Sequence, residues 1–347
     1  MRIDRLWLGD FRNLRNFEVD FDETSPRQVV IGRNGVGKSN LLEALTRIFR
    51  DLDLEEPTRE FEYEIEYLCN GHYVKIANRR PEQSEPLPKR RYWKQPEKNA
   101  PTDRTVRNAL YEEVKEPEFF KLNRTSGDTS SPSRLLPTYV FGYYSGIVDR
   151  YRDIFQKHED NYFREQVTGV EAPLRPLFLA KPHHSKFALL AFFATHDEDA
   201  QRFLREEFHI VGLASVLFAF REPYWAQTKP SKEKMATGDP RFWYAGGKVA
   251  SFVDGLFENS LAPMAGEERL KVSVGVNKTF ERRFCFLPDV AALQKLAKGL
   301  SNKEFFARLE SAIFSDLVRT SGEDLRIRIR LEGVKEPVLF DDLAEGE

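Results

Sequence analysis

Cysteine is scarce in this chain: only Cys69 and Cys285 occur among its 347 residues. So few cysteines exclude a disulfide framework and a cysteine-based zinc cluster, and they are typical of the reducing cytoplasm. Long apolar runs are lacking as well. The longest, Phe187–Ala194 and Val211–Phe220, reach about half of the roughly 20 residues that a membrane helix needs, so both predict buried core helices. The N-terminal residues 1–13 hold no signal-peptide pattern, and we expect a cytoplasmic protein without membrane contact.

A large net charge is also missing. The 53 basic and 55 acidic residues leave a formal net charge of −2, which argues against a uniformly basic nucleic-acid coat protein. Apolar residues, by contrast, are plentiful: they make up 41% of the chain and include 28 phenylalanines, enough to build a core and to exclude wholesale disorder. At about 100–200 residues per domain, the length predicts two or three lobes.

Hydrophobic patterning predicts short strands near the N-terminus, followed by a helix. The expected strands are Ile3–Leu8, Asn16–Phe21, a buried Arg27–Ile31, and a hairpin of Phe61–Leu68 and Tyr73–Ala77 around Asn70-Gly71. The segment Asn40–Arg50 predicts a helix with an apolar face formed by Leu41, Leu42, Leu45, Ile48 and Phe49.

The rest of the chain changes character several times. Residues 79–107 are rich in proline and basic residues and predict a linker or a surface insertion. Within them, Lys89–Lys94 mixes basic and aromatic side chains, which suits contact with DNA or RNA; a solvated surface is the alternative. Beyond this segment we expect a buried strand at 138–144, mostly helices over 150–265, strands at 270–276, 279–286 and 325–331, and a helical stretch over 289–320.

One motif carries specific chemistry. Residues 32–39, with the sequence GRNGVGKS, fit the phosphate-loop pattern G-x-x-x-x-G-K-[ST] in full. The glycines permit a tight turn with positive φ, and Lys38 places a positive charge on the β- and γ-phosphates. Ser39 offers a hydroxyl to Mg²⁺, and the next helix points its positive end at the phosphates. The expected ATP-binding residues are Gly32, Arg33, Asn34, Gly35, Val36, Gly37, Lys38, Ser39 and Asn40.

The string IGRNGVGKSNLLEAL resembles the phosphate loop of ABC-type ATPases of the SMC, RecF and OLD group, and RLWLGDFRNLRNFEVDF resembles the first hairpin of the same group. The resemblance is specific over about residues 1–50. It implies that Arg12 and Asn13 lie near the ribose or the phosphates; a solvated loop is the alternative for this turn. It also implies ATP and Mg²⁺ as cofactors.

The C-terminal FDDLAEGE resembles the signature motif of the group, which contacts the γ-phosphate held by a partner subunit; an acidic tail is the alternative. The motif residues are Leu343, Ala344, Glu345, Gly346 and Glu347, and Ala344 replaces the usual serine. No apolar strand ending in Asp-Glu follows the phosphate loop, so the catalytic residues are unknown. The motif order predicts the front part of a larger ATPase that ends on its signature.

The segment GYYSG at 142–146 is a weaker match. With a following Arg150 or Arg152, it resembles predicted defence-associated ATPases, and Tyr144 and Ser145 lie where the group has its sensor loop. A buried aromatic strand that enters a loop is the alternative.

We therefore expect an α/β fold: a P-loop NTPase head of ABC type with an antiparallel β side sheet and an inserted helical lobe. The expected divisions are a head with phosphate loop and hairpin (1–78), a basic insertion (79–137), a central strand and sensor loop (138–155), a helical lobe (156–265), and strands and a helix leading to the signature (266–347).

Two hypotheses for function follow. In the first, the chain is an ATPase subunit of bacterial antiphage defence or DNA repair, which forms a homodimer or higher oligomer around ATP and controls a nuclease or effector. In the second, it is an ATP-binding scaffold that recruits an effector without turnover. A small-molecule kinase is a weaker third hypothesis, since it would lack the hairpin and the signature.

Overall fold

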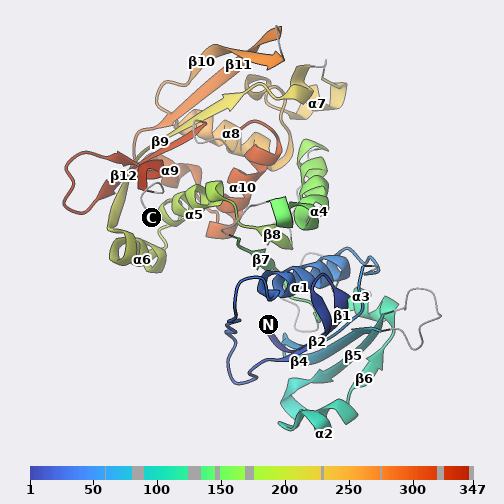
Figure 1. Cartoon of the computed structure of the whole chain (residues 1–347). Helices are drawn as coiled ribbons and strands as arrows, with labels where there is room; N and C mark the ends of the chain where they lie inside the picture. Colours follow the sequence, from blue (N-terminus) through green and yellow to red (C-terminus); the bar gives the residue numbers. More distant parts are fainter. Residues whose placement is uncertain are drawn as a thin grey trace. The chain divides into compact units, whose positions relative to one another are not determined.

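The computed structural model describes residues 1–58, 60–79, 90–123, 134–144, 149–168, 176–227, 230–273, 276–318 and 324–343. The chain divides into two compact units, drawn in Figure 1. Unit 1 comprises Met1–Gln156 and Pro176–Leu179, and unit 2 comprises Lys157–Arg175 and Ala180–Glu347. Each unit has its own hydrophobic core, and no helix in the described ranges is long and apolar enough to cross a membrane.

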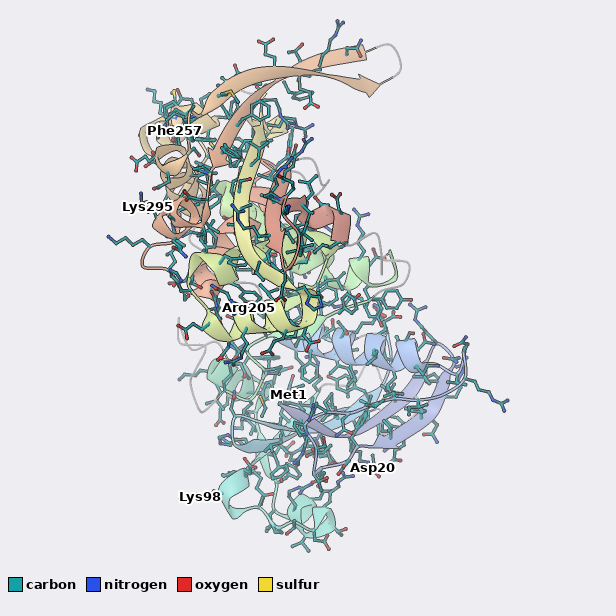
Figure 2. All side chains as sticks on the ribbon, turned by 90° about the vertical axis from the view of Figure 1, so that its left-hand side faces the viewer. Met1, Asp20, Lys98, Arg205, Phe257 and Lys295 are labelled. Carbon is teal, nitrogen blue, oxygen red and sulfur yellow. The ribbon has the colours of Figure 1, made fainter. Side chains whose placement is uncertain are left out.

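Unit 1 is built on a six-stranded sheet in which all neighbouring strands are antiparallel. Its strands, in spatial order, are β2 (Leu14–Asp20), β1 (Arg2–Phe11), β3 (Tyr63–Cys69), β4 (His72–Asn78), β5 (Arg91–Pro96) and β6 (Glu112–Val114). The helices of this part are α1 (Lys38–Asp53), α2 (Arg104–Ala109) and α3 (Glu116–Asn123), with a short 3₁₀ helix η1 (Glu97–Asn99). Figure 2 labels Met1 before β1, Asp20 at the end of β2 and Lys98 in η1.

The strands predicted around the N-terminal hairpin and around Asn70-Gly71 are confirmed, and α1 confirms the predicted helix. On α1, Leu41, Ile48 and Phe49 are buried against the sheet and Leu45 packs beside them. Leu42 is an exception because it is 53% exposed, which puts it outside the core-facing stripe.

The predicted buried strand at Arg27–Ile31 is wrong. These residues form no strand, and the side chains of Val29 and Ile31 are 82% and 89% exposed. A strand is stable only when a neighbour satisfies its backbone hydrogen bonds, and no strand in the described ranges pairs with this segment. The apolar run therefore leads into the phosphate loop without belonging to a sheet.

The proline-rich segment contributes to the sheet as well. Its residues 91–96 form β5, which pairs with β4 on one side and with β6 on the other. The predicted buried strand at 138–144 is reduced to β7 (Val140–Gly142), in which Phe141 is 64% exposed. β7 pairs in parallel with β8 (Leu177–Leu179), and α4 (Asp149–Thr168) begins shortly after β7.

Unit 2 is a mixed α/β unit, and the helical lobe that we expected over 156–265 contains one long strand, β9 (Ile210–Arg221), among its helices. Its five-stranded antiparallel sheet has the order β10 (Met264–Ser273), β11 (Val276–Leu287), β9 (Ile210–Arg221), β12 (Leu325–Leu331) and β13 (Val338–Leu339). The helices are α5 (Pro182–Ala194), α6 (Glu198–Phe208), α7 (Lys232–Thr237), α8 (Gly247–Asn259), α9 (Val290–Leu296) and α10 (Asn302–Phe314), with 3₁₀ helices η2 (Tyr224–Gln227), η3 (Pro240–Phe242) and η4 (Phe340–Leu343). The predicted strands at 279–286 and 325–331 are confirmed. The strand predicted at 270–276 overlaps β10 at 270–273, and residues 274–275 lie outside the described residues.

The predicted core helix at Val211–Phe220 is wrong, because these residues form β9 at the centre of the unit 2 sheet. A continuous apolar run of this length fits a buried strand as well as a buried helix. The neighbouring prediction is confirmed: Phe187–Ala194 lies in α5, whose apolar residues belong to the same core.

Each unit holds one buried thiol. Cys69 on β3 is 3% exposed and Cys285 on β11 is 1% exposed. Burial raises the pKa of both thiols, that of Cys285 to about 11. Since the thiolate is the reactive form, we expect both cysteines to react with an aromatic disulfide reagent at pH 8 more than about 100-fold slower than in the unfolded chain. Peptide mapping after timed labelling measures each site separately; fast labelling of either in the native protein would contradict its burial.

Candidate phosphate-binding site

The phosphate loop depends on two glycines with positive φ. Gly35 has φ 85° and Gly37 has φ 109°, a region that residues with a side chain avoid. At Gly37 there is also no space for a side chain, because an added Cβ would lie 2.8 Å from Cδ2 of Leu14 and 3.0 Å from Oδ1 of Asn13. Only glycine therefore permits both the turn and the close approach of the β1–β2 hairpin.

Lys38 is the first residue of α1 and reaches back across the loop. Its ammonium donates to the carbonyl oxygen of Gly32 at 2.6 Å and to that of Arg33 at 2.7 Å. These contacts hold the positive charge over the loop, where phosphate oxygens would take the place of the carbonyl groups. The predicted loop residues from Gly32 to Asn40 thus form one continuous turn into the helix.

The N-terminus of α1 lacks the usual cap. Its cap residue is Gly37, which has no side chain to accept a hydrogen bond, and the first turn holds no acidic residue. The backbone N–H groups of the first turn and the positive end of a 16-residue helix therefore face the loop. Together with Lys38, this arrangement fits a phosphate group. Ser39 follows at the second helical position, where its hydroxyl could complete the shell of a phosphate-bound Mg²⁺.

The β1–β2 turn is joined to the middle of this loop and to the first turn of α1 through Asn13. Its amide Nδ2 donates to the carbonyl oxygen of Gly35 at 3.0 Å, and its Oδ1 accepts from the amide of Asn40. This single side chain fixes the hairpin against the phosphate loop. Asn13 therefore lies beside the phosphate loop, and its place next to a bound nucleotide stays a prediction.

Arg12 lies in the same turn, with φ 54°, but its guanidinium is held by a residue that the sequence did not single out. Its Nη2 donates at 2.7 Å to Oε1 of Glu43, a fully buried carboxylate on α1. The same oxygen accepts from Nε of Arg47 at 3.1 Å. The sequence does indicate this contact: Glu43 lies within the apolar string LLEAL, and a buried carboxylate needs cationic partners.

A second residue missed by the sequence analysis is Tyr151 on α4. Its hydroxyl donates to the carbonyl oxygen of Ser39 at 3.0 Å, and its ring lies 5.0 Å from that of Tyr144. The end of β7 is therefore linked to the phosphate loop through two tyrosines. Ser145 lies outside the described residues.

The signature and the basic segment are the other predicted sites. Of the signature residues, Leu343 ends η4, and Ala344, Glu345, Gly346 and Glu347 lie outside the described residues. In the basic segment, Arg90 is buried and donates to the carbonyl oxygen of Asp51, whereas Arg91 is exposed and pairs with Glu113 at 3.2 Å.

Residues 1–125 match the family model of the AAA ATPase domain. This match covers both the hairpin and the phosphate loop, and it supports a nucleotide-binding P-loop ATPase of AAA type in this part of the chain. No curated protein and no solved structure matches the chain.

The Glu43 carboxylate is expected to keep the hairpin turn in place. We expect Glu43→Gln to weaken MgATP binding about tenfold, because Arg12 loses a charge-assisted hydrogen bond worth roughly 1.5–3 kcal/mol. Glu60→Gln is the matched control, since Glu60 pairs at 2.8 Å with Arg47 whereas Arg12 pairs with Glu43. Titration calorimetry measures both; an equal loss in the two variants would contradict a specific role for Glu43.

Proposed function

We propose that this chain is the ATP-binding part of an ABC-type ATPase of the SMC, RecF and OLD group. The observation that carries the proposal is the bridge made by Asn13 between Gly35 and Asn40, which joins the first hairpin to the phosphate loop. The resemblance to this group implies that the aromatic-Arg-Asn turn lies beside the nucleotide. ATP would lie over Gly32–Asn40, with Mg²⁺ on the hydroxyl of Ser39.

The finer parts of the proposal concern assembly and biological role. Two copies would form a sandwich around ATP, with the signature at 343–347 of one copy facing the phosphate loop of the other. Opening and closing of the sandwich would control a nuclease or another effector in antiphage defence or DNA repair. If residues 79–107 contact DNA or RNA, Arg91 and Lys94 are the cations of residues 90–94 that are not buried, since Arg90 is buried.

The alternative proposal is an ATP-binding scaffold without turnover. It is favoured by one observation: after residue 39, no strand within the described ranges ends in an Asp-Glu pair that could hold Mg²⁺ and activate water. The Asp341-Asp342 pair follows β13, but Asp341 forms an ion pair with Lys186 at 2.7 Å.

Binding and hydrolysis of MgATP, measured together on the chain and its Lys38→Ala variant, separate these proposals. Lys38-dependent binding with phosphate release supports the ATPase, and binding without release supports the scaffold. An ATP-dependent increase in mass by analytical ultracentrifugation supports the sandwich. Binding that does not depend on Lys38 would contradict every version of the proposal.

A further inference from the structure

A row of arginines lies on the outer face of β12 in unit 2. The strand reads LRIRIRL, and its side chains alternate between the two faces of the sheet. The apolar set is buried in the unit 2 core, and the arginine set is exposed. The buried residues are Leu325, Ile327 and Ile329, and the exposed ones are Arg326, Arg328 and Arg330.

Among the described residues, no acidic side chain neutralises these three guanidinium groups. Across the part of the chain that the structure describes, no carboxylate lies within ion-pairing distance of any of them. Arg282 on the same sheet shows the contrast, because it pairs with Glu268 and with Asp324, each at 2.8 Å. Like charges in one row repel one another, and an anion that covers the row would relieve this repulsion.

The neighbouring strand leaves space beside the arginines. On β9, Gly212 lies opposite Arg330 and Ser215 lies opposite Arg328. A Cβ added to Gly212 would touch Cδ of Arg330 at 3.9 Å, which places this arginine over the glycine. The small side chains therefore keep the face open for a ligand that lies along β12.

An aromatic residue completes the face one strand further on. Phe286 on β11 pairs with Leu217 of β9, which in turn pairs with Arg326, so all three side chains lie on the outer face. Phe286 is only partly buried. A partly exposed aromatic ring thus lies on the same face as the cations, to the side of Arg326 and separated from it by Leu217.

We propose that this face, named the β12 arginine face, binds a single strand of nucleic acid. Side chains two residues apart on a strand are about 6.6 Å apart, so the row presents cations at a regular interval to a polymer with a regular series of anions. The guanidinium fork matches phosphate geometry, and Phe286 offers a surface on which a base can stack. An acidic peptide would satisfy the arginines but has no bases to stack on the ring.

The proposal does not depend on the nucleotide site, and its test needs no ATP. The probe is a fluorescein-labelled 20-nucleotide single-stranded DNA, whose anisotropy is followed from about 0.05 to 0.3 M salt. For Arg326→Gln/Arg328→Gln/Arg330→Gln we expect binding on the order of 100-fold weaker at about 0.1 M salt, with the slope of log K against log salt reduced by about 2. Arg328→Gln alone should reduce that slope by about 0.7.

The control removes the same charge from the helical side of the same unit, by Lys295→Gln/Lys298→Gln/Lys303→Gln. These lysines are exposed on or next to α9 and α10, and Lys295 is labelled in Figure 2. The control should bind like the unchanged protein, and the arginine variant should keep the slow labelling of Cys285. The proposal is overturned by unchanged DNA binding in the arginine variant, by an equal loss in the lysine control, or by competition from poly-glutamate or anionic vesicles as strong as that from unlabelled DNA.

Discussion

Replacing Lys38 with alanine should weaken MgATP binding at least about 100-fold, which corresponds to roughly 2.7 kcal/mol. The ammonium of Lys38 lies 2.6 and 2.7 Å from the carbonyl oxygens of Gly32 and Arg33, so it is held at the loop before any phosphate arrives. Its removal deletes the only side-chain charge in contact with those two carbonyls among the described residues. Titration calorimetry with MgATP measures the loss directly.

Two controls make this result specific. Lys98→Ala removes an exposed lysine from the 3₁₀ helix η1 of the same unit and should leave the affinity unchanged. Slow labelling of Cys69 in the Lys38→Ala variant would show that unit 1 is folded. If the Lys38→Ala variant bound MgATP like the unchanged chain, nucleotide binding at this loop would be disproved.

The phosphate loop itself could be predicted from the sequence because its requirements are local. Two glycines with positive φ, a lysine and the start of an amphipathic helix follow one another within eight residues, and no distant contact is needed to recognise them. The expectation that Asn13 lies near the nucleotide came from the resemblance alone. The structure shows that Asn13 is joined to the phosphate loop by a pair of hydrogen bonds, to Gly35 and Asn40, across 22 and 27 residues.

The contacts that tie this loop to the rest of unit 1 could not be derived in this way. The periodicity places Glu43 at a core position, but only the structure shows that its carboxylate pairs with Arg12, which lies 31 residues away. Tyr151 reaches Ser39 across 112 residues. Such pairs are set by how β1, α1 and α4 pack together, which hydrophobic periodicity does not encode.

The errors in secondary structure have a common cause. Val29–Ile31 and Val211–Phe220 are both apolar runs, and each pattern states only that the segment can be buried. The second run has partner strands on both sides and forms β9, whereas the first has none in the described ranges and lies exposed. Whether an apolar run becomes a strand, a helix or an exposed segment is decided by its neighbours in the fold.

The largest structural effect should come from Gly37→Ala. Positive φ costs a residue with a side chain about 1–2 kcal/mol, and forcing a methyl group against Leu14 at 2.8 Å adds roughly 1–3 kcal/mol. The relief of this clash would push the β1–β2 hairpin away from the loop and break the bridge through Asn13. We expect unit 1 to open more often, so that Cys69 is labelled more than about tenfold faster while Cys285 in unit 2 keeps its rate.

Gly35→Ala separates the clash from the backbone strain. Gly35 also has a positive φ, of 85°, but an added Cβ would meet no atom within 4 Å. This variant should therefore pay only the backbone cost of about 1–2 kcal/mol, with labelling of Cys69 well below the rate in Gly37→Ala. Because the hairpin contact at Gly37 is what distinguishes the two positions, equal labelling in the two variants would show that the hairpin does not pack against the phosphate loop in solution. A faster rate for Gly37→Ala alone would show that β1–β2 and the phosphate loop open as one structural element.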